Sequence, residues 1–92
     1  MIIGGDGIIT WRQMLTGECK SNGDEFEDLE MTLTAEELDK EFYDGYGAEE
    51  GAPFTAWSKN WVYFPAIYDG SEWVASAPRN PCDVKTDHVG GG

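Results

Sequence analysis

Carboxylates are the residues of this chain with the clearest chemical potential. Between Asp24 and Glu50 there are twelve Asp and Glu residues and a single base, Lys40, for a net charge of −11 in 27 residues. The other 65 residues hold six acids and five bases, so they add only −1 to the total of −12. Concentrated negative charge on a folded surface attracts cationic partners and repels nucleic acid and anionic lipid. We therefore expect a protein partner with a basic surface, and neither direct nucleic-acid binding nor membrane binding.

The acidic segment is also apolar enough to fold, which distinguishes it from a disordered acidic tail. Its apolar residues are Phe26, Leu29, Met31, Leu33, Leu38, Phe42, Tyr43 and Tyr46. We interpret the segment as a charged face on a folded scaffold. The candidate partner-binding residues on this face are Asp28, Glu30, Glu36, Glu37, Glu41, Asp44, Glu49 and Glu50.

The predicted spacing of these carboxylates is comparable to that of phosphates along a nucleic-acid strand. Glu37 and Glu41 lie one helical turn apart, a rise of about 6 Å, if their segment is helical. Asp28 and Glu30 lie about 6.5–7 Å apart if they share one face of a strand. A face with this pitch fits an Arg/Lys groove that normally binds a nucleic-acid backbone.

Other kinds of site find little support in the sequence. His88 is the only histidine and it lies in a Gly-terminated tail, and no Ser or Cys has a nearby base. Neither end of the acidic segment has the twelve-residue calcium loop with oxygen ligands at alternate positions. We expect no catalytic residue, no metal and no cofactor. A small hydrolase that uses a pair of carboxylates is kept as a third class of function.

An aromatic stripe offers a second candidate surface. If a three-residue Ser58–Asn60 loop sets the strand register, then Trp57, Trp61 and Tyr63 share one face of a sheet. Such a stripe either belongs to the core, covered by a helix that contains Trp11, or is an exposed anchor for a protein partner.

Length and composition indicate one small domain spanning residues 1–92, with an extended, partly mobile tail from about residue 83. Cys19 and Cys82 are too few for a disulfide scaffold and are expected to be reduced thiols. The N-terminus has no basic region before its apolar residues, and no apolar run approaches the roughly 20 residues that span a bilayer. We expect a cytoplasmic protein.

Two short helices are predicted in the N-terminal half. Thr10 is a good N-cap for a helix over residues 11–16 that Gly17 ends. Thr34 and Glu37 form a capping box that begins a second helix, which continues through Phe42 to Gly45. Between the helices, a loop over residues 18–27 precedes a half-buried strand in which Leu29, Met31 and Leu33 alternate with polar residues.

Three strands are predicted in the C-terminal half, over residues 54–57, 61–68 and 72–77, with a type I′ turn at Asp69-Gly70. Pro65 has no N–H group, so a bulge at Pro65 or a strand end at Phe64 is expected. The predicted fold is a small single-domain α+β structure. It has a three- to four-stranded antiparallel sheet, including a C-terminal β-meander, and two short helices.

In overall character the chain resembles the small acidic inhibitors of bacteriophages and mobile elements, including DNA-mimic anti-restriction proteins and anti-CRISPR proteins. The resemblance consists of length, an isoelectric point near 4.1, clustered carboxylates and the absence of a catalytic set, with no shared motif. It implies a non-enzymatic inhibitor that docks its acidic face into a basic, nucleic-acid-binding cleft of a host defence protein, in the cytoplasm of a bacterial host. The alternative is a regulatory or assembly module that binds a protein through Trp57, Trp61 and Tyr63.

Overall fold

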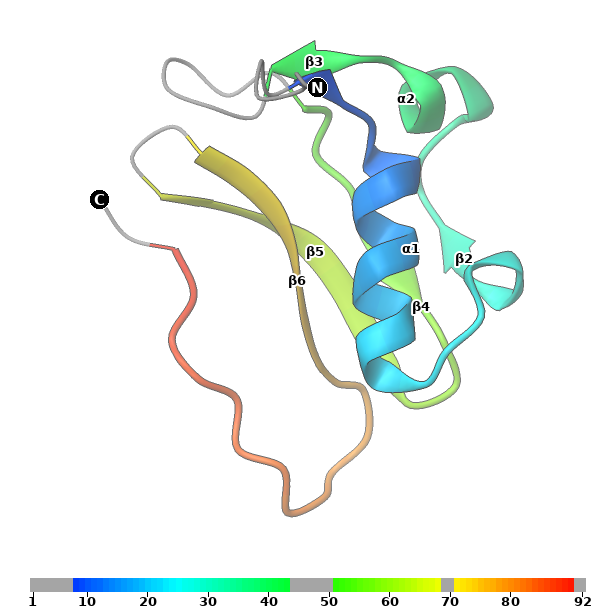
Figure 1. Ribbon diagram of the computed structural model, residues 1–92. Helices are drawn as coiled ribbons and strands as arrows, with labels where there is room; N and C mark the ends of the chain where they lie inside the picture. The colour runs from blue at the N-terminus through cyan, green and yellow to red at the C-terminus, as the bar shows by residue number, and fades with distance from the viewer. Residues whose placement is uncertain (1–7, 44–50, 69–70, 91–92) are drawn as a thin grey trace.

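A computed structural model describes residues 8–43, 51–68 and 71–90 of the chain. Their elements are β1 (Ile8–Ile9), α1 (Trp11–Asn22), the 3-10 helix η2 (Phe26–Asp28), β2 (Glu30–Met31), α2 (Ala35–Asp39), β3 (Phe42–Tyr43), β4 (Ala56–Trp57), β5 (Trp61–Tyr68) and β6 (Ser71–Pro78). Antiparallel strands in the order β2-β4-β5-β6 form a four-stranded sheet, and β1 pairs with β3 in a separate ribbon (Figure 1). This confirms the predicted α+β class, with two helices and a β4-β5-β6 meander.

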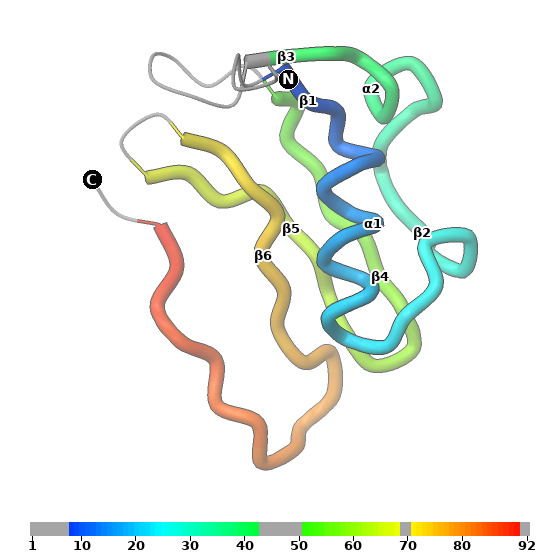
Figure 2. Tube along the Cα trace, in the orientation of Figure 1, coloured from blue at the N-terminus to red at the C-terminus, as the bar shows by residue number. Residues whose placement is uncertain are grey.

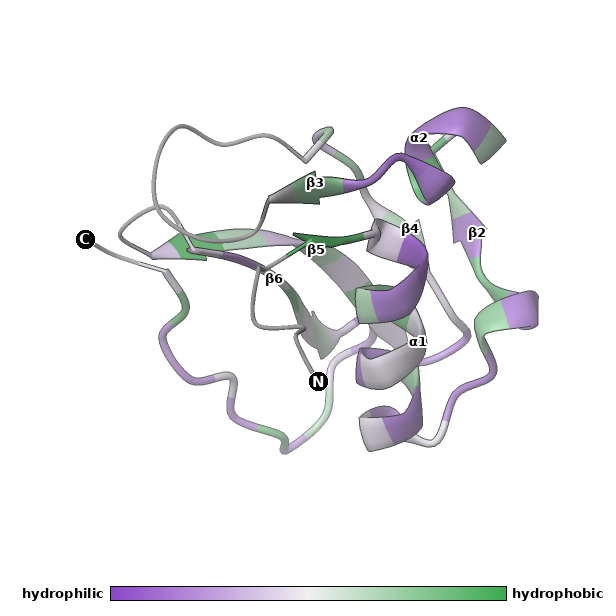
Figure 3. Cartoon of the chain, turned by 45° about the horizontal axis from the view of Figure 1, so that its top comes forward, coloured by the Kyte–Doolittle hydropathy of each residue, from purple (hydrophilic) through white to green (hydrophobic). Residues whose placement is uncertain are grey.

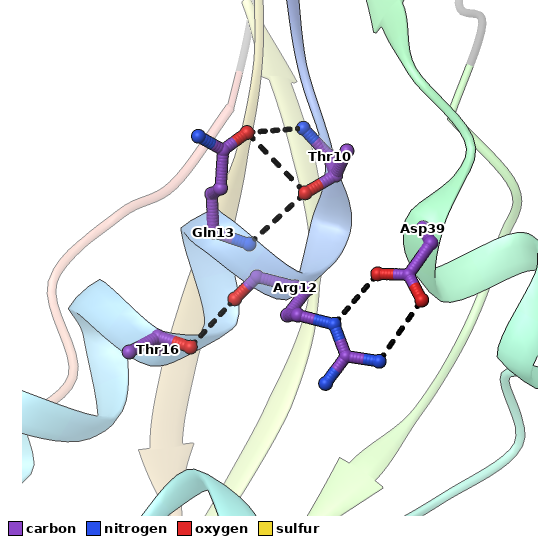
Figure 4. A network of polar contacts seen from close by, with 5 residues as sticks. All are labelled: Thr10, Arg12, Gln13, Thr16 and Asp39. Atoms are coloured by element: carbon purple, nitrogen blue, oxygen red, sulfur yellow. Dashed lines mark hydrogen bonds and ion pairs between the residues drawn. The ribbon is translucent and has the colours of Figure 1, made fainter.

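Helix α1 begins as predicted but is twice as long. The Thr10 hydroxyl accepts a hydrogen bond from the Gln13 amide at 3.2 Å, and the Gln13 side chain accepts one from the Thr10 amide at 3.0 Å (Figure 4). The predicted end at Gly17 is wrong, because Trp11, Leu15 and Cys19 continue one buried stripe at four-residue intervals.

Gly23 is the residue that ends α1. Its φ of 77° is in the left-handed region, where glycine has no steric penalty. The Asp24 amide donates to the Cys19 carbonyl at 2.8 Å and the Gly23 amide donates to the Lys20 carbonyl at 3.3 Å, which is the Schellman arrangement. The predicted loop over residues 18–27 is therefore helical as far as Asn22.

Helix α2 has the predicted capping box but is shorter than predicted. Glu37 donates its amide to the Thr34 hydroxyl at 3.1 Å, while its carboxylate accepts the Thr34 amide at 3.0 Å. The helix ends at Asp39 because the residues that follow pair with the N-terminal strand, Phe42 opposite Ile9. Phe42 is buried as predicted, but as a strand residue.

The hydrophobic core lies between α1 and the sheet. Trp11, Leu15, Ala56 and Tyr63 are 1% exposed or less, and the Trp11 ring lies 5.0 Å from that of Phe54. Met14, Phe26, Met31 and Trp61 are among the partly buried residues that pack against this core. Helix α1 thus contributes three of the buried core residues, Trp11, Leu15 and Cys19.

The register of the sheet differs by one residue from the predicted one. The Ser58 amide donates to the Trp61 carbonyl at 2.9 Å, so only residues 59 and 60 connect the strands and Trp57 lies opposite Val62. A shift of one residue moves a side chain to the other face of a sheet. Trp57 consequently lies on the opposite face from Trp61 and Tyr63, and Ala56 lies with Tyr63.

The far face is the side of the sheet turned away from α1. Tyr63 and Ser76 hydrogen-bond to residues of α1, so the residues that alternate with them point the other way. By this alternation the far face carries Trp57, Val62, Phe64, Ala66, Trp73, Ala75 and Ala77, with Glu30, Tyr68 and Ser71 at its margins. Glu30, Tyr68 and Ser71 are exposed, Ala75 is 4% exposed, and the other residues of this face are half-buried.

Strand β5 continues through Pro65 without the predicted bulge, and Pro65 lies opposite Val74. The Trp61 carbonyl points toward β4, and every second residue along a strand points its backbone groups the same way. The nitrogen of Pro65 therefore points toward the β4 side, beyond the end of that short strand. No hydrogen bond to β6 is lost, so proline is tolerated in a sequence that reads as a central strand. The Asp69-Gly70 turn lies outside the described residues.

Candidate functional site

The acidic residues gather at the edge of the molecule formed by η2, β2 and α2. These elements lie on one side of α1, and the β5–β6 hairpin lies on the other (Figure 1). Colouring by hydropathy shows α2 as largely hydrophilic, in contrast to the apolar residues of β5 (Figure 3). Strand β2 is the outermost strand of the sheet next to this edge.

Six carboxylates on this edge are exposed and make no hydrogen bond or ion pair with any described residue. We call them the acidic edge, and they are Glu25, Glu27, Asp28, Glu30, Glu36 and Glu41. The described part of the same segment, residues 24–41, contains one base, Lys40, which is also exposed. The charge of the edge is therefore not neutralised within the part of the chain that the structure describes.

Three other carboxylates of this segment have structural partners. Asp39 receives a bidentate ion pair from Arg12, with Nε–Oδ1 at 2.6 Å and Nη2–Oδ2 at 3.0 Å (Figure 4). The hydrogen bonds from Arg12 lower the pKa of the Asp39 carboxyl. Glu37 caps α2, and Asp24 accepts the hydroxyl of Tyr63. These acids hold elements together.

The structure corrects both spacing arguments for the predicted face. Asp28 ends η2 while Glu30 is in β2, so the two do not share a strand. Glu41 follows the end of α2, so it is not one helical turn above Glu37. Glu36 and Glu37 instead line a shallow depression with Thr34, Asp39 and Lys40. Asp44, Glu49 and Glu50 lie outside the described residues.

Glu25 and Glu27 belong to the acidic edge but were not among the predicted residues. Their segment was predicted to be a loop before the strand, whereas the structure places both at the start of η2 with exposed side chains. The sequence signal for these two residues is that five of the seven residues from Asp24 to Glu30 are acidic.

The alternative aromatic surface is divided by the sheet. Tyr63 is fully buried beneath α1, and Trp61 is half-buried against the same core. Trp57 lies on the far face, opposite Val62. The three residues therefore do not form one exposed patch, and the far face presents a different aromatic set.

A polar cluster joins the C-terminal half of α1 to the sheet. The side-chain nitrogen Nδ2 of Asn22 donates to the Tyr63 hydroxyl at 3.3 Å and to the Ser76 hydroxyl at 3.0 Å. Ser76 donates to Glu18 at 2.7 Å, and Tyr63 donates to Asp24. Among the described residues, no buried side-chain nitrogen or oxygen lacks a partner. The cluster is thus a satisfied network that fixes the helix on the sheet.

Two weakly acidic side chains of this region, Tyr63 and Cys19, are held in their neutral forms. Burial, and then the hydrogen bond to Asp24, raise the pKa of the Tyr63 phenol. Burial also raises the pKa of the Cys19 thiol, which is 1% exposed. A raised pKa makes each group less available as an anionic nucleophile near neutral pH. Neither group is activated for catalysis.

We expect Tyr63→Phe to lower the free energy of unfolding by about 1–2 kcal/mol at pH 7, because it removes one hydrogen bond to a charged acceptor. The difference in unfolding free energy between this variant and the wild-type protein should become smaller at alkaline pH. Tyr63 has a folded-state pKa above its unfolded value, so its contribution is complete below the unfolded pKa of about 10 and is lost as pH rises above it. Urea unfolding of both proteins at pH 7 and at about pH 10.5 measures this. A difference in unfolding free energy that is the same at both pH values would contradict the raised pKa of Tyr63.

Within the described ranges, no helix is both long and apolar enough to cross a membrane. No group of three or more His, Cys, Asp or Glu residues is placed to hold a metal ion within those same ranges. The fold and the acidic edge define a small, acidic α+β domain. Comparison with protein-family models, curated proteins and solved structures finds no match.

Proposed function

We propose that this protein is a non-enzymatic inhibitor that presents its acidic edge to a basic, nucleic-acid-binding cleft of a host defence protein. The observation that supports this is the set of six exposed carboxylates on one edge, none of them paired with a described residue. The proposed partner is a protein in the cytoplasm of a bacterial host, and its Arg and Lys residues supply the charge that the edge lacks.

The physical basis is electrostatic complementarity. Each exposed ion pair contributes little, about 0–1 kcal/mol. Several aligned charges together accelerate association and exclude partners of the wrong sign. Binding of this kind displaces the counterions of the cleft and competes with the nucleic acid that the cleft normally holds. Affinity should therefore fall steeply as salt rises.

The proposal is tested by capture of a partner from bacterial lysate on the tagged protein, with elution by a salt gradient and by added duplex DNA or RNA. We expect a nucleic-acid-binding protein that elutes at moderate salt and that nucleic acid displaces. The double variant Glu27→Lys/Glu30→Lys should lose this partner, because it changes the charge of the edge by four units in the positive direction.

A matched control distinguishes the effect of the acidic edge from the effect of net charge. Asp83→Lys/Asp87→Lys makes the same change of charge at two exposed acids outside the acidic edge. This control should retain the partner at low salt, and circular dichroism should show both variants folded. Equal capture by the edge variant and the wild-type protein would refute the proposal.

A further inference from the structure

Asn22 and Gly23, at the end of α1, form the dipeptide in which asparagine loses its side-chain amide most readily. Glycine has no side chain to hinder the approach of its backbone nitrogen to the asparagine side chain. The other two asparagines of the chain, Asn60 and Asn80, precede a tryptophan and a proline. A bulky residue hinders this approach, and proline has no N–H group to react. The sequence therefore selects Asn22 among the three asparagines.

The reaction is an intramolecular substitution at the side-chain amide. The backbone nitrogen of Gly23 bonds to Cγ of Asn22, the Cγ–Nδ2 bond breaks, and the N–H proton of Gly23 leaves with the amide group as ammonia. Water then adds to one of the two carbonyl carbons of the resulting cyclic imide. Cleavage of one C–N bond of the imide gives aspartate, and cleavage of the other gives isoaspartate. Water is thus the only reactant that the protein does not supply.

The surroundings of Gly23 leave room for this reaction. Gly23 is exposed, and a Cβ added to it would have no atom within 4 Å apart from those of its chain neighbours. The chain turns at the end of α1, which is cyan in Figure 2, and runs on toward β2. Water therefore has access to the peptide bond between Asn22 and Gly23.

The folded protein nevertheless holds both reacting groups. The Gly23 amide donates to the Lys20 carbonyl at 3.3 Å. Nδ2 of Asn22 donates to the hydroxyls of Tyr63 and Ser76. The last turn of α1 must open before the nitrogen of Gly23 can reach Cγ of Asn22. Because helix ends fray and open at a lower free-energy cost than the core, this step is accessible without global unfolding.

The polar cluster accepts only a hydrogen-bond donor at position 22. Tyr63 donates its one hydroxyl hydrogen to Asp24. Ser76 donates its one hydroxyl hydrogen to Glu18 at 2.7 Å. Both hydroxyls can therefore only accept a hydrogen bond from residue 22, and the amide of Asn22 supplies it. A carboxylate in its place has no hydrogen to donate, and it adds negative charge at the C-terminal end of a helix, which disfavours anions.

We propose that Asn22 is a site of spontaneous deamidation, and that conversion of its amide to a carboxylate releases the end of α1 from the sheet. The reaction takes place while the end of α1 is open, and its product does not fit the closed arrangement. Loss of ammonia makes the conversion irreversible in water. The site therefore acts as a one-way switch. This inference does not depend on the proposed function, because it concerns the polar cluster and not the acidic edge.

Peptide mapping by mass spectrometry tests the site in the folded wild-type protein, kept for several weeks at neutral pH and physiological temperature. We expect the mass increase of amide-to-acid conversion at Asn22, in an amount severalfold above that at Asn60 and Asn80. Unfolding in guanidinium chloride should accelerate the conversion at Asn22 severalfold further, because it removes the hydrogen bonds that hold the reacting groups. Conversion of the folded protein at Asn22 that is absent, or no faster than at Asn60 and Asn80, would overturn the proposal.

The variant Asn22→Asp tests the consequence for α1, with Asn60→Asp as a control that makes the same change of charge at an exposed position. Asn22→Asp should lower the midpoint of urea unfolding. It should also accelerate hydrogen exchange of the Asp24 amide severalfold, since this amide donates to the Cys19 carbonyl at the end of the helix. The control should do neither.

The aged wild-type protein gives the same answer if the variant does not fold. Its deamidated fraction carries one more negative charge, so anion exchange separates it from the unmodified fraction. The two fractions are then compared by the same unfolding and hydrogen-exchange measurements. A deamidated fraction that keeps the midpoint and the exchange rate of the unmodified protein would overturn the release of α1.

Discussion

Replacement of Trp11 by alanine should lower the free energy of unfolding by about 3–5 kcal/mol, the usual cost for a large aromatic residue in a core. Trp11 is fully buried, and its ring centroid lies 4.9 Å from that of Phe42 and 5.0 Å from that of Phe54. Its indole nitrogen donates to the Ala52 carbonyl at 3.0 Å. One side chain therefore connects α1, β3 and the segment before β4. Urea unfolding followed by far-UV circular dichroism measures the change.

Small domains have a total stability of about 5–15 kcal/mol, so this loss leaves the variant close to unfolding near 37 °C. Trp57→Ala is the matched control, because Trp57 is half-buried on the far face. It should cost less than half as much. A loss under about 1 kcal/mol for Trp11→Ala would mean that this residue does not organise the core.

Replacement of Gly51 by alanine should destabilise the protein by about 1–3 kcal/mol through overpacking. The added Cβ would overlap the Cζ2 atom of Trp11. It would also lie 2.8 Å from Cε2 of Trp11 and 3.0 Å from Oε1 of Glu72. The indole cannot move aside because it is enclosed on all sides. The change is measured by the same urea unfolding experiment.

Two further variants isolate the cause of this effect. Gly17→Ala is the same substitution at an exposed helical position with no atom within 4 Å of the new Cβ, and it should stabilise α1 by up to about 1 kcal/mol. Trp11→Phe removes Cζ2, so adding Gly51→Ala to that variant should cost less than it costs in the wild-type protein. Additive losses in this cycle would show that the steric contact with Trp11 is not responsible.

Local signals in the sequence predict where elements begin better than where they end. The caps at Thr10 and Thr34 involve residues three positions apart, so the sequence alone is sufficient to recognise them. The end of α1 depends on burial of Cys19 against the sheet, and the end of α2 depends on pairing of Phe42 with Ile9. Such long-range contacts override the local preference of Gly17 to stop a helix and of residues 40–43 to continue one.

In the candidate site, too, the sequence predicts one part and long-range contacts decide the rest. The charge of the acidic segment follows from counting residues, but the carboxylates that remain available depend on the fold. Asp39 is engaged by Arg12, 27 positions away, and Asp24 by Tyr63, 39 positions away. The prediction that Trp57, Trp61 and Tyr63 share one face of the sheet is wrong because two residues connect β4 and β5, where three were expected.

The acidic edge gives the charge of the described residues an uneven distribution, which is an electric dipole. The six unpaired carboxylates lie with η2, β2 and α2, whereas the β4–β5 connection and the C-terminal segment carry three bases, Lys59, Arg79 and Lys85, and two acids, Asp83 and Asp87. In the field of a positively charged surface, such a dipole experiences a torque before any contact forms. A partner of the proposed kind would therefore meet the protein already rotated, with the acidic edge turned toward the partner.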